Sequence, residues 1–304
     1  MGETCIKSGF RHGDKADYFV TKIASSHPRN VDIGLSPSSG VMLLFSQLTG
    51  KLVCLLQDDG YLTDLRTAVA SSLAVATFGP RNIRRIGIVG TGVQALLQLE
   101  MLRNITDCRE VTIFGRNEGK LASIQKEAKK LGYTSVLVTK CAAEVASSCN
   151  VIITVTSSSE PLLMARDIRP GSLIIAMGAD GLGKQELDPH VMSPDITDLV
   201  LVDSSVQCCG FGEASHAIKA GCLQVSECIE IGHALTLLEM KDDISSLSED
   251  EKEIYYNCNI RAGDKRPSTG LPYSVVFDST GVAIQDVQVA EAVFNAHMAR
   301  QGKM

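Results

Sequence analysis

The sequence predicts an α/β protein in which a doubly wound parallel sheet is inserted into a second, α+β domain formed by both ends of the chain. Three observations carry this prediction. A glycine-rich turn with the spacing Gly-x-Gly-x-x-Ala directly follows a short apolar segment at residues 84–90. Short β-branched segments then alternate with helical ones as far as about residue 209, whereas the two flanking regions lack this alternation.

The middle of the chain, residues 79–209, is predicted to form a Rossmann-type domain. Residues 84–90 give its first strand, because an uninterrupted apolar run bounded by turn residues is typical of a strand buried on both faces. Parallel strands joined by right-handed helical crossovers then make a doubly wound sheet. The other strands are expected at residues 110–114, 135–139, 150–156, 173–177 and 199–203, and the helices at 96–104, 118–131 and 142–148.

The flanks, residues 1–78 and 210–304, are predicted to fold together as the second domain, because neither holds many apolar residues by itself. Ser248 and Glu251 have the spacing of a capping box at a helix start. The expected elements are extended segments at 18–24 and 41–45, a helix at 63–78, helices at 226–240, 248–257 and 287–299, and a strand at 273–278.

Composition excludes several classes of protein. The chain has 304 residues, of which 44% are hydrophobic and 21% charged, with a formal net charge of −6. These values exclude a mainly disordered chain and argue against nucleic acid or an acidic membrane surface as the main partner. No apolar run approaches the roughly 18 residues that span a bilayer. Ten cysteines without a Cys-x-x-Cys pair, and no secretory signal, favour a reduced, cytoplasmic protein without a metal site.

The glycine turn predicts a dinucleotide site, because it stands between an apolar strand and a helix. Gly90 allows the tight turn, Gly92 lets backbone amides approach a pyrophosphate, and Ala95 permits close packing of helix on strand. The helix N-terminus adds N–H groups and a dipole that favour an anion. The alternative is a glycine turn with a purely structural role.

The end of the second strand indicates which dinucleotide is bound. NAD sites place a carboxylate there to accept the ribose 2′-OH, whereas this chain has Gly115-Arg116-Asn117. With no acid to repel a 2′-phosphate and a guanidinium to bind one, NADP(H) is favoured and NAD(H) remains possible. The alternative for Arg116 is an ordinary solvated side chain at a strand end.

Three charged residues are candidates for the substrate site. Lys22 lies on a predicted strand, where alternation alone leaves open whether it faces water, and Arg66 lies in the first turn of a predicted helix. Asp180 follows the strand at 173–177, and ligands of a doubly wound sheet bind outside the carboxyl ends of its strands. Taken singly, each could be a surface group.

Together with other motifs these residues resemble the ornithine cyclodeaminase and mu-crystallin family. The motifs run in the same order over nearly the whole chain. They are Lys22; His27-Pro28-Arg29-Asn30 with Gly34-Leu35; residues 40–45 with Thr49-Gly50; Leu62-Thr63-x-x-Arg66-Thr67-Ala68; Gly90-x-Gly92-x-Gln94; Gly178-Ala179-Asp180-x-x-Gly183-Lys184-x-Glu186-Leu187-Asp188; and residues 277–286.

The resemblance implies an NAD(P)-dependent enzyme that acts at the Cα–N bond of a small amino acid or cyclic imino acid, and a homodimer built through the flanking domain. It implies that Lys22 and Arg66 hold the substrate carboxylate and that Asp180 is the acid/base near the α-amino group. The residues that it places around the cofactor are Thr67, Gly90, Thr91, Gly92, Val93, Gln94, Arg116, Asn117, Thr156, Met177, Gly178, Ser279, Thr280 and Gly281.

One departure from the family concerns the carboxylate site. Members normally carry another arginine upstream of the segment that holds Lys22, and this chain begins 21 residues before Lys22. Arg11 is too close to Lys22 in sequence to be assigned that role. Weaker carboxylate binding, or reduced activity, is therefore expected.

Asp180 favours an ornithine cyclodeaminase-like activity, which converts L-ornithine to L-proline and ammonia with the dinucleotide recycled in place. Three alternatives stay open. They are NADPH-dependent reduction of a cyclic ketimine, an alanine-type amino-acid dehydrogenase, and a catalytically silent NADP(H)-binding protein.

Overall fold

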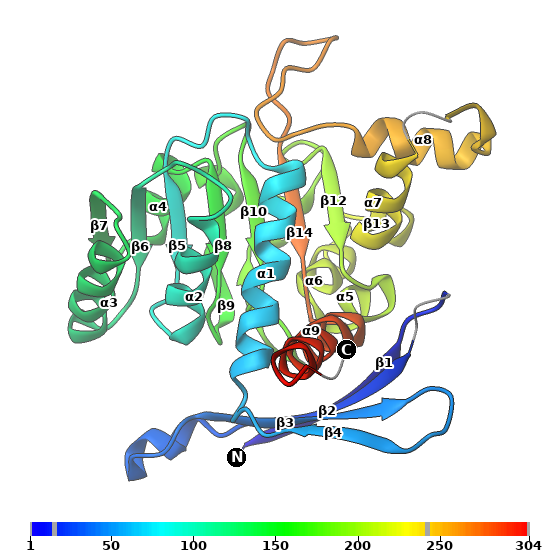
Figure 1. The fold of residues 1–304 in the computed structure, drawn as a ribbon. Helices are drawn as coiled ribbons and strands as arrows, with labels where there is room; N and C mark the ends of the chain where they lie inside the picture. Colours follow the sequence, from blue (N-terminus) through cyan, green and yellow to red (C-terminus); the bar gives the residue numbers. More distant parts are fainter. Residues whose placement is uncertain (1, 14–16, 241–243, 303–304) are drawn as a thin grey trace. The chain divides into compact units, whose positions relative to one another are not determined.

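The computed structural model describes residues 2–13, 17–240 and 244–302, and over these residues the chain forms two compact units. The larger unit comprises residues 71–280, and the smaller one comprises residues 1–70 together with 281–304 (Figure 1). The boundary between Ala70 and Ser71 falls within helix α1 (Tyr61–Phe78).

Within the described residues, the larger unit is built on an eight-stranded sheet in the order β13-β12-β14-β10-β8-β5-β6-β7, and every neighbouring pair is parallel. In sequence order this sheet begins with β5 and is extended first to one side, by β6 and β7, and then to the other, from β8 onward, which confirms the predicted doubly wound sheet. The strands are β5 (Ile86–Val89), β6 (Glu110–Phe114), β7 (Ser135–Thr139), β8 (Val151–Thr154), β10 (Leu173–Ala176), β12 (Leu199–Val202), β13 (Cys228–Glu230) and β14 (Val275–Asp278).

Because helices bury the central strands on both faces, the sequences of these strands are almost entirely apolar. Gly87 of β5 shows how close one helix approaches, because a Cβ there would lie 2.4 Å from Cγ1 of Val145. The helices are α2 (Val93–Leu102), α3 (Glu118–Lys130), α4 (Ala142–Ser148), α5 (Ser205–Phe211), α6 (Glu213–Lys219), α7 (Ile231–Glu239) and α8 (Glu249–Cys258), with 3-10 turns η2 (Ala165–Asp167), η3 (Pro189–Met192), η4 (Val225–Glu227) and η5 (Ile244–Ser246). Among the residues described, we find no helix with the length and apolar character that a membrane crossing requires.

The C-terminal part of the sheet differs from the sequence prediction. The strand expected at 273–278 is β14, and it lies in the sheet between β10 and β12. Residues 228–230 form β13 against β12, where one continuous helix was expected over 226–240. Residues 210–280 therefore cluster with the larger unit, so the expected boundaries of 79–209 and of 1–78 with 210–304 differ from the units of the structure.

The smaller unit is an antiparallel sheet packed on a helix. Its strands are β1 (Glu3–Phe10), β2 (Tyr18–Ser26), β3 (Ser38–Ser46) and β4 (Leu52–Leu56), in that order, with the 3-10 turn η1 (Pro28–Ile33) after β2. Val20, Met42 and Leu44 point from β2 and β3 into a core with Val287 and Ala290 of α9 (Ala283–Arg300). The predicted segments at 18–24 and 41–45 are confirmed as strands, whereas β1 and β4 were not expected.

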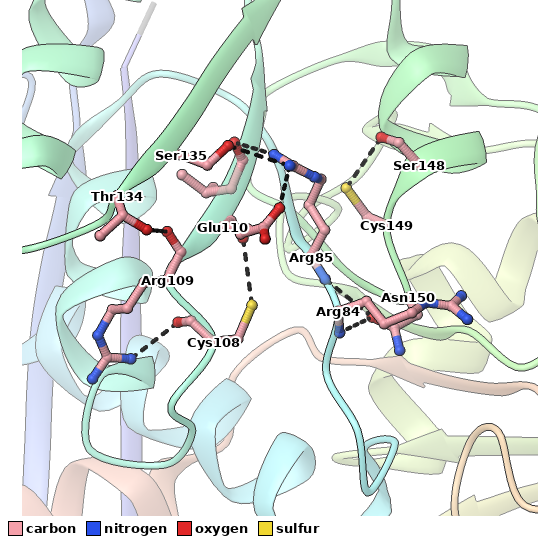
Figure 2. Close-up of polar contacts among 11 residues, drawn as sticks. Arg84, Arg85, Cys108, Arg109, Glu110, Thr134, Ser135, Ser148, Cys149 and Asn150 are labelled. Atoms are coloured by element: carbon pink, nitrogen blue, oxygen red, sulfur yellow. Dashed lines mark hydrogen bonds and ion pairs between the residues drawn. The ribbon is translucent and has the colours of Figure 1, made fainter.

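Polar contacts tie the amino ends of the parallel strands together (Figure 2). The side chain of Arg85, just before β5, pairs with Glu110 of β6 and donates to Oγ of Ser135 on β7 at 3.2 Å. Asn150, just before β8, accepts from the backbone N–H of Arg84 at 3.0 Å. These contacts fix the sheet at the end opposite to the one where a doubly wound fold binds ligand.

A further pair of strands, β9 (Ser159–Leu163) and β11 (Gln185–Leu187), lies outside this sheet.

Candidate functional site

The glycine turn joins β5 to α2 at the carboxyl end of the sheet. Gly90 has a φ of +136°, and a Cβ there would lie 2.9 Å from the carbonyl oxygen of Val155, so glycine alone fits. Gly92 is the N-cap of α2, and open space stands where its side chain would be. The first N–H groups of α2 are therefore accessible to an anion.

A hollow of about 210 Å³ opens over this turn. Five of the predicted cofactor residues line it, namely Gly90, Thr91, Gly92, Arg116 and Thr156. They come from the loops after β5, β6 and β8, and β5 and β8 are the two strands between which the winding reverses direction. The hollow therefore lies at the topological switch point, where doubly wound sheets bind dinucleotides.

The loop after β6 forms one wall of this hollow. A Cβ on Gly115 would lie 2.5 Å from Cγ2 of Thr91, so the glycine lets the threonine pack against the loop. Arg116 is exposed at the edge of the hollow. The side chain of Asn117 instead accepts from the backbone N–H of Lys120 at 3.0 Å and caps α3.

Beside the hollow lies a carboxyl group that the sequence analysis had noted only as part of a motif. Glu186 of β11 is fully buried. It accepts from the backbone N–H of Thr156 at 2.6 Å, from the backbone N–H of Gly178 at 2.9 Å and from Oγ1 of Thr154 at 2.6 Å. Burial raises the pKa of Glu186 to about 7, against the opposing effect of these donors.

Two more buried acids continue from Glu186 toward the end of β14. Glu213 of α6 accepts from the backbone N–H groups of Glu186 and Leu187, the latter at 3.2 Å. Asp278 of β14 in turn accepts from the backbone N–H of Ala214 at 2.9 Å. Burial raises the pKa of Glu213 to about 9, and the charges of Asp278 and Glu186 add to this shift. Burial also raises the pKa of Asp278 to about 7, and the charge of Asp203 acts in the same direction.

The predicted cofactor residues that follow β14 are held by a fourth acid. Ser279 Oγ donates to Asp203 Oδ2 at 2.8 Å, and Thr280 Oγ1 donates to Asp203 Oδ1 at 3.3 Å. Both side chains are buried. The hydroxyl groups of Ser279 and Thr280 thus fix the loop after β14. Met177, another predicted cofactor residue, directly follows β10 and is also buried. Val93 and Gln94 lie in the first turn of α2, with Val93 exposed.

The smaller unit brings Lys22 and Arg66 together. Lys22 shares the inner face of β2 with Val20, so only 2% of it is exposed. Its Nζ donates to Oδ1 of Asp286 on α9 at 3.0 Å, and Nε of Arg66 lies 3.4 Å from the same oxygen. Arg66 also donates from Nη1 to Oε1 of Gln285 at 2.7 Å. The two cations, Lys22 and Arg66, contact a single carboxylate, that of Asp286. These three side chains together therefore carry a net positive charge, which can attract a small anion.

The electrostatics of Lys22 follow from this packing. Burial lowers the pKa of Lys22 to about 8, and the positive charges of Arg66 and Lys7 act in the same direction. Asp286 opposes this shift through its charge and its hydrogen bond. Lys22 is therefore mainly protonated at neutral pH and close to its titration range.

Lys7 is a cation of this cluster that the sequence analysis missed. It lies directly opposite Lys22 in the register of β1 and β2, and its Nζ donates to the carbonyl oxygen of Gly281. Gly281 has a φ of +81°, and a Cβ there would lie 2.6 Å from Nη1 of Arg66. Arg11 by contrast pairs with Glu291 at 2.6 Å. Thr67 donates to the carbonyl oxygen of Thr63 within α1 at 2.9 Å.

Asp180 belongs to the larger unit, in the loop after β10. Its side chain is 52% exposed and pairs with Lys184 four residues further on. His216 contacts the carbonyl oxygen of Lys184 through Nε2 at 2.9 Å and so fixes the end of this loop on α6. The carboxylate is thus both accessible and beside a cation.

A doubly wound sheet with a glycine turn and a hollow at its switch point defines an enzyme of the NAD(P)-dependent class. The model of the ornithine cyclodeaminase/mu-crystallin family matches residues 12–301. The chain belongs to this family, as its motifs had indicated.

Relatives of known name support this assignment. The alanine dehydrogenase of Archaeoglobus fulgidus is 32% identical over 277 residues, which are 91% of this chain and 76% of the relative. The iminosuccinate reductase of Paracoccus denitrificans is 29% identical over 289 residues, or 94% of this chain and 79% of the relative. The structure of an archaeal alanine dehydrogenase dimer with bound NAD superposes with a TM-score of 0.77 at 28% identity, and covers 98% of this chain and 87% of that one.

Proposed function

We propose that this protein transfers hydride between NAD(P)(H) and the α-carbon of a small α-amino or α-imino acid. The observation that carries the proposal is the buried cluster of Lys22, Arg66 and Asp286, which offers two cations around one carboxylate oxygen. A planar guanidinium beside an ammonium defines the position and orientation of a substrate carboxylate. Dehydrogenases and reductases of amino and imino acids among the relatives fit the same substrate class.

The chemistry divides between the residues as follows. Lys22 and Arg66 hold the carboxylate, so that the Cα–H bond keeps one direction during the reaction. The dinucleotide supplies the site that accepts or donates the hydride when it is bound. Asp180 takes a proton from the amine as the imine forms and returns it in the reverse direction. The ion pair with Lys184 keeps a positive charge beside Asp180.

Net oxidation or reduction of the amino-acid/imino-acid pair is the first candidate for the overall reaction. Lys7 adds a third cation to the cluster of the smaller unit, and such a cluster repels a substrate with a second ammonium group. Cyclodeamination of ornithine is the second candidate, and the accessible carboxylate of Asp180 favours it. The two differ in whether reduced cofactor accumulates.

A substrate panel separates these reactions. We expect reduction of NAD(P)⁺ with L-alanine, L-aspartate or L-proline, and oxidation of NAD(P)H with the corresponding imines. Ornithine with a catalytic trace of cofactor, yielding proline and ammonia without net NAD(P)H, would assign cyclodeamination instead. Binding of the dinucleotide without turnover of any substrate would contradict the proposal and favour a silent binding protein.

We propose NADP(H) as the preferred cofactor, because Arg116 lines the edge of the hollow and the loop after β6 carries no acid. An Arg116→Ala variant is expected to bind NADPH about 10-fold to 100-fold more weakly, the cost of one charge-assisted hydrogen bond to a phosphate. NADH binding should stay unchanged. Fluorescence titration with both cofactors measures this, with Arg169→Ala on the exposed loop before β10 as the matched control. Equal losses for NADPH and NADH would refute the assignment.

We also propose that the outer face of the smaller unit's sheet joins two copies of the chain. Ile6, Phe10 and Leu55 on this face are 67%, 51% and 55% exposed, and the rings of Phe19 and Phe45 stack beside them at 4.8 Å. Exposed large apolar residues gathered on one face in this way mark an interface. A second copy is favoured as its occupant because the archaeal alanine dehydrogenase relative is a dimer.

Phe10→Asp is expected to convert the dimer to a monomer, since it places a charge within this apolar face. Sedimentation velocity measures the change. Leu48→Asp, at a residue that is 93% exposed in the turn between β3 and β4, is the matched control and should remain dimeric. A monomeric wild-type protein would contradict the proposed interface.

A further inference from the structure

Glu186 contacts two loops of the larger unit at once. One of its carboxylate oxygens, Oε1, accepts from the backbone N–H of Thr156 in the loop after β8, and the other, Oε2, accepts from the backbone N–H of Gly178 in the loop after β10. Thr154 adds a hydroxyl donor to Oε2 from the last residue of β8. The fully buried carboxylate therefore fixes the separation of two neighbouring strand ends.

The fit around Glu186 leaves little room for change. A Cβ on Gly178 would lie 2.4 Å from Oε2 of Glu186 and 2.2 Å from the carbonyl oxygen of Thr156. The backbone of Glu186 is itself held by Glu213, whose helix is held by Asp278 at the end of β14. The carboxyl ends of β8, β10 and β14 are thus connected through one line of buried acids.

These loops lie on one side of the switch point. The glycine turn and Arg116 follow β5 and β6, where a doubly wound fold holds the adenosine half of a dinucleotide. The loops after β8 and β10 belong to the second half of the sheet. In a dinucleotide that crosses the switch point, this second half faces the nicotinamide mononucleotide.

We propose that Glu186 is a positioning residue that sets the loops after β8 and β10 in the arrangement that binds the nicotinamide half of the cofactor. The inference rests on the proposed function, since it takes the hollow at the switch point as the dinucleotide site. It assigns Glu186 no contact with the substrate or the reacting atoms, and its effect passes through the backbone of Thr156 and Gly178.

The requirement for a carboxylate follows from the directions of the hydrogen bonds. Each oxygen of Glu186 accepts from a backbone N–H, and backbone N–H groups can only donate. A glutamine at this position keeps one oxygen and presents an NH2 group in place of the other. Whichever way its amide is turned, one loop loses its acceptor and meets a second donor.

Glu186→Gln therefore tests the proposal, with the adenosine-half fragment 2′,5′-ADP as the internal reference. We expect the dissociation constant for NADPH to rise at least about 10-fold, while that for 2′,5′-ADP stays unchanged. Isothermal titration of both ligands measures this split, which a general loss of stability would not produce. Glu160→Gln, at an exposed position on the neighbouring strand β9, is the matched control and should behave as wild type in both titrations.

Two results would overturn the inference: unchanged binding of both ligands, or equal weakening of both. Wild-type protein that binds neither NADPH nor NADH would instead remove the proposed function on which the inference rests. If Glu186→Gln does not fold, Thr154→Val removes one donor to Oε2 while leaving both backbone contacts in place. That variant should bind NADPH more weakly than the wild type, by a smaller factor than Glu186→Gln, and its affinity for 2′,5′-ADP should again be unchanged. Equally weakened binding of both ligands would count against the proposal.

Discussion

A Lys22→Met variant is expected to lose about 10³-fold in kcat/KM for the amino or imino acid, mainly through a higher KM. Lys22 and Arg66 are the two cations proposed to bind the substrate carboxylate, and Lys22 is buried. Methionine fills the volume of the lysine side chain but lacks its positive charge. The loss of one partner of a buried charge pair costs roughly 4 kcal/mol. Steady-state kinetics and a separate titration with NADPH measure the effect, and cofactor binding should be retained.

The control for this variant is Lys51→Met, at an exposed lysine next to β4. It should leave both kcat/KM and the dissociation constant for NADPH unchanged. The pH dependence gives a second, independent reading. Because the pKa of Lys22 is lowered to about 8, the ammonium is present below that pH and is lost above it. Binding of pyrrole-2-carboxylate, whose charge is constant over this range, should weaken above about pH 8 in the wild type and be independent of pH in Lys22→Met. Wild-type affinity of Lys22→Met for this ligand would refute the role of Lys22.

Asp180→Asn is expected to lower kcat by about 10³-fold with little change in KM, because asparagine keeps the shape of the side chain and cannot exchange a proton. Loss of the exposed ion pair with Lys184 should cost little stability. Asp195→Asn, at an exposed position in the loop before β12, is the matched control. Wild-type turnover by Asp180→Asn would exclude this residue as the acid/base.

The sheet of the larger unit could be predicted because its strands are short, apolar and separated by clear turns. Ile86–Val89 and Leu173–Ala176 are buried on both faces, so their composition alone identifies them. The place of β14 could not be predicted in the same way. Its residues, Val275–Asp278, pair with β10 and β12, although the segment that contains α5 to α8 separates β14 from β12 in sequence. Sequence order gives no information on such long-range pairing.

The candidate site shows a similar division. The glycine turn and Arg116 could be found from local spacing, because a strand, a turn and a helix follow one another there. Lys7 could not, since its role depends on the register of β1 against Lys22 on β2, and β1 was not expected. Glu186 was visible as a motif residue, but its contacts with Thr156 and Gly178 become apparent only when the loops of two strands come together.

Isotope transfer tests most directly whether hydride moves between the dinucleotide and the α-carbon. We would incubate the protein with NADP⁺ and L-amino acids deuterated at C2, and analyse cofactor and product by mass spectrometry. We expect deuterium in the reduced nicotinamide or, for cyclodeamination of ornithine, deuterium retained at C2 of proline without net NADPH. Product that carries solvent hydrogen at C2, with no deuterium in the cofactor, would contradict this transfer.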